Sequence, residues 1–191
     1  TDLKVMAQRI DTSFPWHDPA LATQSYVEGK LQAEAYLYRD GSLPLVTARI
    51  GHVLAGPEDY TARLAHYVDL VRLRAPLRYS SAAAASSFID AQGAASFLAW
   101  AGAQDFTGPI NAACDGGLSA FDIFHRVGMA LDEPVKALPV ARAAAPGQLS
   151  PFDYPRQLMM DTSRAAGLGY RFGHVEEWID DVIRQHDLAF V

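Results

Sequence analysis

The sequence predicts an α/β protein built on a parallel sheet. The main signal is the apolar run Leu45–Leu54, which is rich in β-branched residues, as expected for a parallel strand that is covered on both faces. This run lies between two segments in which apolar residues recur at helical spacing, one from Leu21 to Tyr38 and one opened by Glu58 and Asp59. A strand between two helices along the chain is typical of the α/β class.

The first helical segment carries the chemistry that we single out. Tyr26 and Lys30 are four residues apart, so in a helix they share one face. A phenol titrates near pH ~10, and a neighbouring ammonium group stabilises its phenolate, so such a pair can act as a general acid or base. The alternative is a half-buried tyrosine beside a solvated lysine.

Several local signals predict how the elements begin, end and pack. We expect Gly41 to end the first helix, Arg49 to form a structural ion pair, and Ser119 with Asp122 to cap a later helix. His125 is expected to be a partly buried structural histidine, since no second ligand stands at metal spacing. Core-facing residues are predicted in three helices: Val27, Leu31, Ala35 and Tyr38; Leu64, Tyr67, Val68 and Val71; and Val175, Trp178, Ile179, Val182 and Ile183.

Composition narrows the class of protein. Half of the 191 residues are hydrophobic, which is enough for a substantial core. The single cysteine, Cys114, excludes an internal disulfide and leaves no metal-binding pair. The net charge of −6 argues against non-specific binding of nucleic acid. Neither a basic-then-apolar leader nor a membrane-length apolar run is evident, so we expect a cytoplasmic protein without membrane association.

The segment Ser25-Tyr26-Val27-Glu28-Gly29-Lys30 resembles the catalytic helix of the extended short-chain dehydrogenase/reductase family, the NAD(P)-dependent epimerases and dehydratases, with Gly29 where that family often has serine. The strand ending at Gly56-Pro57 and the segment Met159–Tyr170 are also similar to that family. The resemblance implies that residues 1–75 end a Rossmann-type core and that residues 76–191 mainly bind substrate. It also implies hydride transfer between NAD or NADP and a small carbonyl compound or secondary alcohol. Tyr26 would be the acid/base, Lys30 would orient the nicotinamide ribose, and Thr1 would hold the reacting oxygen.

Two departures from the family pattern limit these expectations. The sequence has no G-x-G-x-x-G turn, so we expect the second half of an enzyme that alone is inactive and binds dinucleotide weakly. The pair Ser86-Ser87 stands where nucleotide-sugar epimerases carry a phosphate-binding arginine, which puts a UDP- or dTDP-sugar substrate in doubt. Candidate substrate-binding cations elsewhere in the sequence are Arg78, Arg142 and Arg156.

Other functions stay open at this point. A thioester reductase domain of a multidomain synthase shares the Tyr/Lys helix. A non-enzymatic binding or regulatory protein of the same fold is the other alternative, and retention of Tyr26 and Lys30 argues against it. The resemblance also implies that such a chain can form a homodimer through the helix that carries Tyr26.

Overall fold

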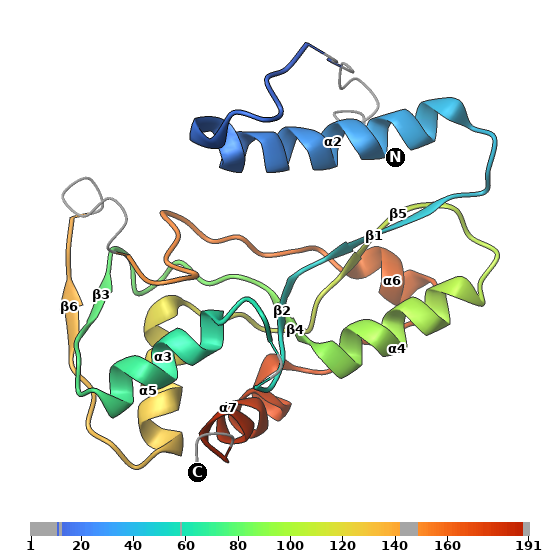
Figure 1. Ribbon diagram of the computed structural model, residues 1–191. Coiled ribbons are helices and arrows are strands. Elements are labelled where there is room, and N and C mark those ends of the chain that lie inside the picture. The colour runs from blue at the N-terminus through green and yellow to red at the C-terminus, as the bar shows by residue number, and fades with distance from the viewer. Residues whose placement is uncertain (1–10, 12, 58, 142–148, 189–191) are drawn as a thin grey trace. The chain divides into compact units, whose positions relative to one another are not determined.

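The protein has the predicted α/β class, as Figure 1 shows. The computed structural model describes residues 11, 13–57, 59–141 and 149–188. These residues form two compact units. Unit 1 comprises the described residues up to Arg49 together with Ala103–Ile110, and unit 2 comprises Ile50–Gly102 together with the described residues from Asn111 onward.

The long helix of unit 1 is α2 (Ala22–Asp40), which follows the 3-10 helix η1 (Pro19–Leu21). Gly41 ends α2 in the left-handed conformation with φ 63°, which confirms the predicted stop. The predicted core stripe is wrong at its first position, because Val27 is 48% exposed. Ala35 is buried as predicted, and the polar Gln32 is buried beside it.

An ion pair ties the end of β1 (Val46–Ile50) to α2. Nη2 of Arg49 lies 2.8 Å from Oε1 of Glu34, and Nε of Arg49 donates to both oxygens of the same carboxylate. The arrangement is bidentate, which is the strong geometry for a guanidinium and a carboxylate. The prediction that Arg49 is a structural ion-pair partner is therefore confirmed.

The apolar run predicted as one strand changes its pairing partner at Gly51. β1 pairs with β5 (Gly108–Ala112), and β2 (His52–Leu54) pairs in parallel with β4 (Phe88–Asp90). At the change, the amide of Gly51 donates to Ala112 and that of His52 donates to the carbonyl of Ser87. A Cβ atom at position 51 would lie 3.0 Å from that Ser87 oxygen, so this close backbone approach favours glycine.

The remaining strands and helices belong to unit 2. β3 (Leu77–Tyr79) pairs in parallel with β6 (Ala137–Pro139). The small-residue helix α4 (Ala91–Gly102) follows β4 directly, and α6 (Ser163–Gly167) lies later in the chain. α5 (Ala120–Ala130) begins with the predicted capping box of Ser119 and Asp122.

The core of unit 2 lies where α3 (Arg63–Arg72), α5 and α7 (Ile179–Leu188) pack together. The predicted stripe of α3 is confirmed, because its four apolar residues Leu64, Tyr67, Val68 and Val71 are buried. The predicted start of α3 is wrong, because the helix begins at Arg63 after Ala62 with φ 51°. Asp59 instead accepts hydrogen bonds from the amide and hydroxyl of Thr61, which holds a turn ahead of the helix.

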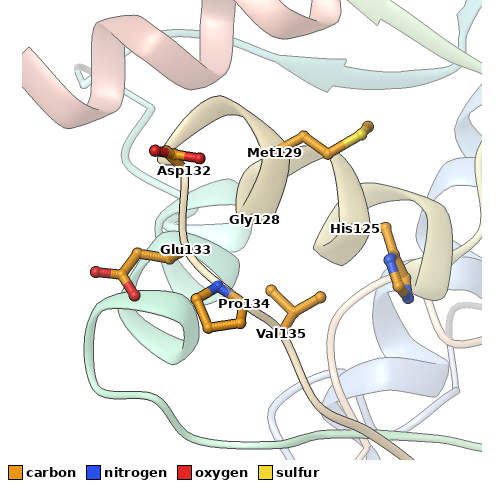
Figure 2. A pocket seen from close by; sticks show the side chains of 7 residues that line it. All are labelled: His125, Gly128, Met129, Asp132, Glu133, Pro134 and Val135. Atoms are coloured by element: carbon orange, nitrogen blue, oxygen red, sulfur yellow. The ribbon is translucent and has the colours of Figure 1, made fainter.

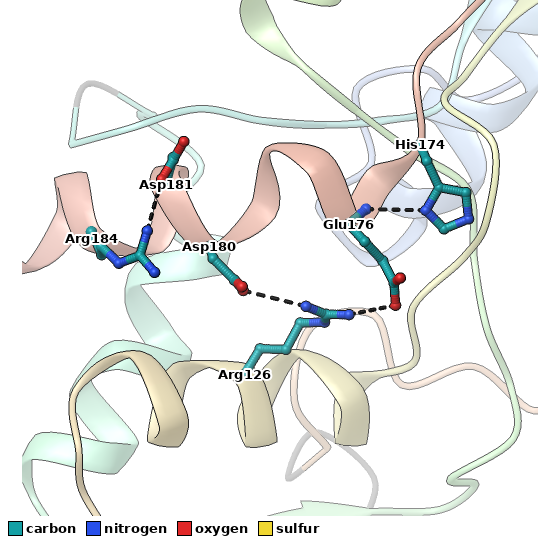
Figure 3. Close-up of polar contacts among 6 residues, drawn as sticks. All are labelled: Arg126, His174, Glu176, Asp180, Asp181 and Arg184. Atoms are coloured by element: carbon teal, nitrogen blue, oxygen red, sulfur yellow. Dashed lines mark hydrogen bonds and ion pairs between the residues drawn. The ribbon is translucent and has the colours of Figure 1, made fainter.

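The last predicted helix is divided into a 3-10 turn, η3 (Val175–Glu177), and α7. Its apolar register is nevertheless as predicted, with Val175, Ile179, Val182 and Ile183 buried. On the outer side Arg126 of α5 lies between two carboxylates, 2.5 Å from Glu176 and 3.4 Å from Asp180 (Figure 3). This cluster joins α5 to the C-terminal segment by charge as well as by apolar packing.

Candidate active site

The predicted pair Tyr26 and Lys30 lies on one face of α2, as the helical spacing requires. The side chain of Tyr26 is 68% exposed, and Lys30 is exposed beside it. Nζ of Lys30 lies 5.7 Å from the centroid of the Tyr26 ring, within the range of a cation–π contact. Both groups are accessible, so the helix presents a phenol hydroxyl and an ammonium group together to whatever binds at this face.

Four other residues were predicted to contribute to the site. Thr1 and Arg142 lie outside the described residues. Arg78 is exposed on β3, and Arg156 is exposed in the segment that follows Tyr154. Arg78 and Arg156 both belong to unit 2, whereas Tyr26 and Lys30 belong to unit 1.

A second group of chemically active side chains surrounds His52 in unit 2. The His52 ring stacks on the Tyr154 ring with centroids 5.5 Å apart, and Nε2 of His52 lies 3.1 Å from the Tyr154 hydroxyl oxygen. Phe88 and Phe152 pack against the same imidazole. Burial, aided by the nearby Arg63 guanidinium, lowers the pKa of His52 from 6.5 to about 4. His52 is therefore a neutral hydrogen-bonding group at physiological pH.

Hydrogen bonds join the segment Ser150–Tyr154 to α3 and to Ser80 within unit 2. His66 of α3 is hydrogen-bonded to Ser150 at 3.0 Å, and the Tyr67 hydroxyl donates to the carbonyl of Pro151. Asp153 accepts hydrogen bonds from the amide and the hydroxyl of Ser80. Burial raises the pKa of Tyr67 and lowers that of His66. These contacts fix the position of the segment that carries Tyr154.

The two serines that stand where nucleotide-sugar epimerases carry a phosphate-binding arginine are both buried. Ser86 and Ser87 lie just before β4, and Ser87 accepts a hydrogen bond from the amide of Met160 at 2.9 Å. The hydroxyl of Ser86 is buried and has no hydrogen-bond partner among the residues that the structure describes. Neither side chain carries a charge that would bind a phosphate group.

A pocket of about 400 Å³ lies at the end of α5 and beside the loop that follows it (Figure 2). His125 and Met129 of α5 and the carboxylates of Asp132 and Glu133 are among its lining residues. The prediction for His125 is wrong, because its side chain is exposed and packs on Phe121 with centroids 4.4 Å apart. Position 125 falls on the outer side of the helix while Phe124 and Val127 fill the core.

Two features of the described residues bear on other classes of function. No three His, Cys, Asp or Glu side chains in this part of the chain gather closely enough to hold a metal ion. No helix within the described ranges has both the length and the hydropathy needed to cross a bilayer.

The chain matches no protein-family model and no curated protein. It is similar in structure to UDP-glucose 4-epimerase of Thermus thermophilus, solved with NAD, with a TM-score of 0.64 at 15% identity over 85% of this chain and 53% of that one. It is also similar to dTDP-4-dehydrorhamnose reductase of Yersinia enterocolitica, with a TM-score of 0.61 at 15% identity over 86% and 55% of the two chains.

A third similar structure is the Bordetella bronchiseptica enzyme WbmG, solved with NAD and UDP. The TM-score is 0.61 at 21% identity, over 87% of this chain and 48% of that one. The chain thus spans about half the length of these enzymes. At such identities the similarity shows the fold, an α/β arrangement with parallel strands matching that of Rossmann-type epimerases and reductases.

Proposed function

We propose that this chain belongs to an NAD(P)-dependent oxidoreductase or epimerase that acts on a carbonyl compound or secondary alcohol. The observation that carries the proposal is the exposed pair Tyr26 and Lys30 on one face of α2. The fold supports it, because the similar structures of comparable topology include a UDP-glucose 4-epimerase and a dTDP-4-dehydrorhamnose reductase.

The two side chains have separate tasks in this proposal. The Tyr26 hydroxyl gives a proton to the reacting oxygen or takes one from it, which is the role of a general acid or base. The Lys30 ammonium group has three N–H donors, which suit it to hold the ribose hydroxyls of a dinucleotide. When bound, NAD(P) supplies or accepts the hydride. Thr1 is proposed to hold the reacting oxygen, and Arg78, Arg142 and Arg156 are weaker candidates for contacts with substrate.

The dinucleotide needs more than this helix. A pyrophosphate group in this fold binds at a glycine-rich turn before a helix N-terminus, and the sequence contains no such turn. Residues Tyr26 and Lys30 fit the nicotinamide end only. We therefore propose that the active enzyme also contains a nucleotide-binding half, and that these 191 residues alone bind dinucleotide weakly and are inactive.

The intact mass of the native gene product and titrations with NADH and NADPH test this last point. A longer product that binds dinucleotide, while the 191-residue chain does not, would agree with it. Tight binding of either dinucleotide by the 191-residue chain would contradict it. The resemblance also leads us to propose a homodimer through α2, and sedimentation of the same preparation measures whether the protein is a dimer.

The acid/base role is tested by Tyr26→Phe with Tyr36→Phe as its matched control. Tyr36 is on the same helix and is 60% exposed, so both substitutions remove one hydroxyl from a similar surface. We expect Tyr26→Phe to lower kcat about 100-fold or more, the usual contribution of a positioned acid or base, and Tyr36→Phe to have no effect.

Turnover is measured with the full-length gene product, NADH or NADPH, and a panel of carbonyl compounds and nucleotide sugars. Equal activity of Tyr26→Phe and wild type would refute the assignment. A strict requirement for a substrate linked to 4′-phosphopantetheine would instead favour a thioester reductase.

A further inference from the structure

The loop before η1 places an aromatic side chain beside Gly29, three residues after the candidate acid/base Tyr26. Trp16 is half-buried, and a Cβ atom at Gly29 would lie 3.7 Å from Cζ3 of its indole. The Phe14 ring packs on the indole with centroids 4.6 Å apart. Both aromatic residues belong to unit 1 with α2, so the contact is internal to that unit.

Position 29 is a direct neighbour of the candidate catalytic group. On a helix, residues three and four apart lie next to one another, so Gly29 and Lys30 are both adjacent to Tyr26. At Gly29 the helix has no side chain, and the indole lies over its backbone. The ring therefore lies beside the turn that carries Tyr26, whose own side chain remains exposed.

Specific contacts hold this loop against the helix. The amide of Asp11 donates to Oε1 of the buried Gln32 at 2.8 Å, which ties the start of the loop to α2. The Asp11 carboxylate in turn accepts hydrogen bonds from the amide and hydroxyl of Ser13. At the other end Asp18 accepts from the amide of Ala20, where η1 begins. The Asp11 contact with α2 thus precedes the aromatic pair in the sequence, and the local Asp18 cap follows it.

The geometry points to Trp16 as a specificity-determining residue that contacts the substrate of Tyr26. This inference rests on the proposed function. An indole face takes an apolar face of its ligand, since it offers a large rigid surface and no charge. Such a face occurs on the C–H side of a sugar ring and on the carbon skeleton of a simple cyclic or aromatic carbonyl compound. We therefore infer that the substrate has an apolar face next to its reacting oxygen and that this face packs on the Trp16 indole.

The test uses the full-length gene product with three probes: UDP-glucose, benzaldehyde and cyclohexanone, each with NADH or NADPH. Steady-state kinetics and quenching of tryptophan fluorescence are measured for wild type, Trp16→Phe and Trp16→Ala. Trp100→Phe is the matched control, because Trp100 is another half-buried tryptophan and lies in unit 2. Quenching of the Trp16 fluorescence by UDP-glucose would indicate that the indole contacts a sugar face, and quenching by benzaldehyde or cyclohexanone would indicate that it contacts the carbon skeleton of a simple carbonyl compound.

We expect Trp16→Ala to raise KM and Kd about tenfold while kcat stays within about twofold. This pattern is expected when a substitution removes a contact that stabilises the bound substrate and the transition state equally. Trp16→Phe should have a smaller effect, and Trp100→Phe none. The inference is overturned if Trp16→Ala leaves KM and Kd unchanged, or if no probe gives quenching that depends on Trp16.

Failure of this inference is separable from failure of the proposed function. If Tyr26→Phe retains full turnover while quenching through Trp16 persists, the acid/base assignment fails and Trp16 remains a ligand contact. If Tyr26→Phe abolishes turnover while Trp16→Ala behaves like wild type, the acid/base role stands and Trp16 only packs on the helix.

Discussion

Acidification should destabilise unit 2 through His52. Its imidazole packs among Phe88, Phe152 and Tyr154 and stays neutral when folded, because burial and the Arg63 guanidinium lower its pKa from 6.5 to about 4. In the unfolded chain the same group takes up a proton near pH 6.5. Between these two values the unfolded state binds more protons, so the free energy of unfolding decreases as pH falls. The contribution is complete above pH 6.5 and is lost as pH falls through about 4.

The size of the effect follows from the two pKa values. A decrease from 6.5 to about 4 corresponds to an upper limit of about 3 kcal/mol at about 1.4 kcal/mol per pH unit. The ring is only half-buried, and solvent screening reduces this figure to about 1–2 kcal/mol. The substitution His52→Gln removes the titration and keeps a hydrogen-bonding group for the Tyr154 hydroxyl.

The assay is urea unfolding at about pH 7 and at about pH 4.5. Unfolding is monitored by the fluorescence of Trp100 and Trp178, which both lie in unit 2, and the substitution Trp16→Phe removes the signal of the unit 1 tryptophan. Wild type should lose about 1–2 kcal/mol more than His52→Gln on acidification, since all other titrating groups are common to both. His125→Gln, at an exposed histidine of the same unit, should follow wild type. An equal loss in wild type and His52→Gln would refute the reasoning.

Four further substitutions test single positions. Ser86→Ala should leave the free energy of unfolding unchanged or raise it by up to about 1 kcal/mol, because the buried Ser86 hydroxyl has no partner among the described residues. Ser87→Ala should lower the free energy of unfolding by about 1–2 kcal/mol, because it leaves the Met160 amide unpaired. Urea unfolding of both variants checks this, and equal effects would contradict it. Gly29→Ala should stabilise α2 by about 0.5–1 kcal/mol, because a Cβ there meets the indole at an ordinary contact distance; lower stability on urea unfolding would argue against the described loop position. Gly128→Ala should cost about 1–2 kcal/mol, because its Cβ would lie 2.4 Å from a valine methyl group, and an unchanged Tm would count against this packing.

Local features of the site helix could be predicted from sequence because they depend on residues a few positions apart. The face shared by Tyr26 and Lys30 follows from helical spacing, and the stop at Gly41 follows from its tolerance of the left-handed conformation. The capping box likewise depends on two residues only three positions apart, Ser119 and Asp122. The role of Tyr26 and Lys30 in catalysis stays a prediction, because no contact in the structure tests it.

The start of α3 and the exposure of Val27 show where local reasoning stops. Acidic residues at positions 58 and 59 fit a helix N-terminus, yet the turn held by Asp59 and Thr61 delays the helix to Arg63. Apolar spacing assigned Val27 to a buried face, but packing buries the polar Gln32 instead, where it holds the amide of Asp11. A competing local hydrogen bond decided the start of α3, whereas tertiary packing decided which side chains of α2 are buried.

By itself, the sequence determined the α/β class, the helix that presents Tyr26 and Lys30, and the apolar faces of α3 and of the C-terminal segment. Only the tertiary structure decided that Gly51 is the point where the strand changes partner, and that His52 meets Tyr154 across 102 positions of sequence. It also placed the indole of Trp16 over Gly29. Periodicity and capping depend on residues within one or two helical turns of each other, so a local sequence pattern reveals them. These tertiary contacts depend on which elements pack together in the folded core, and no local sequence pattern specifies that packing.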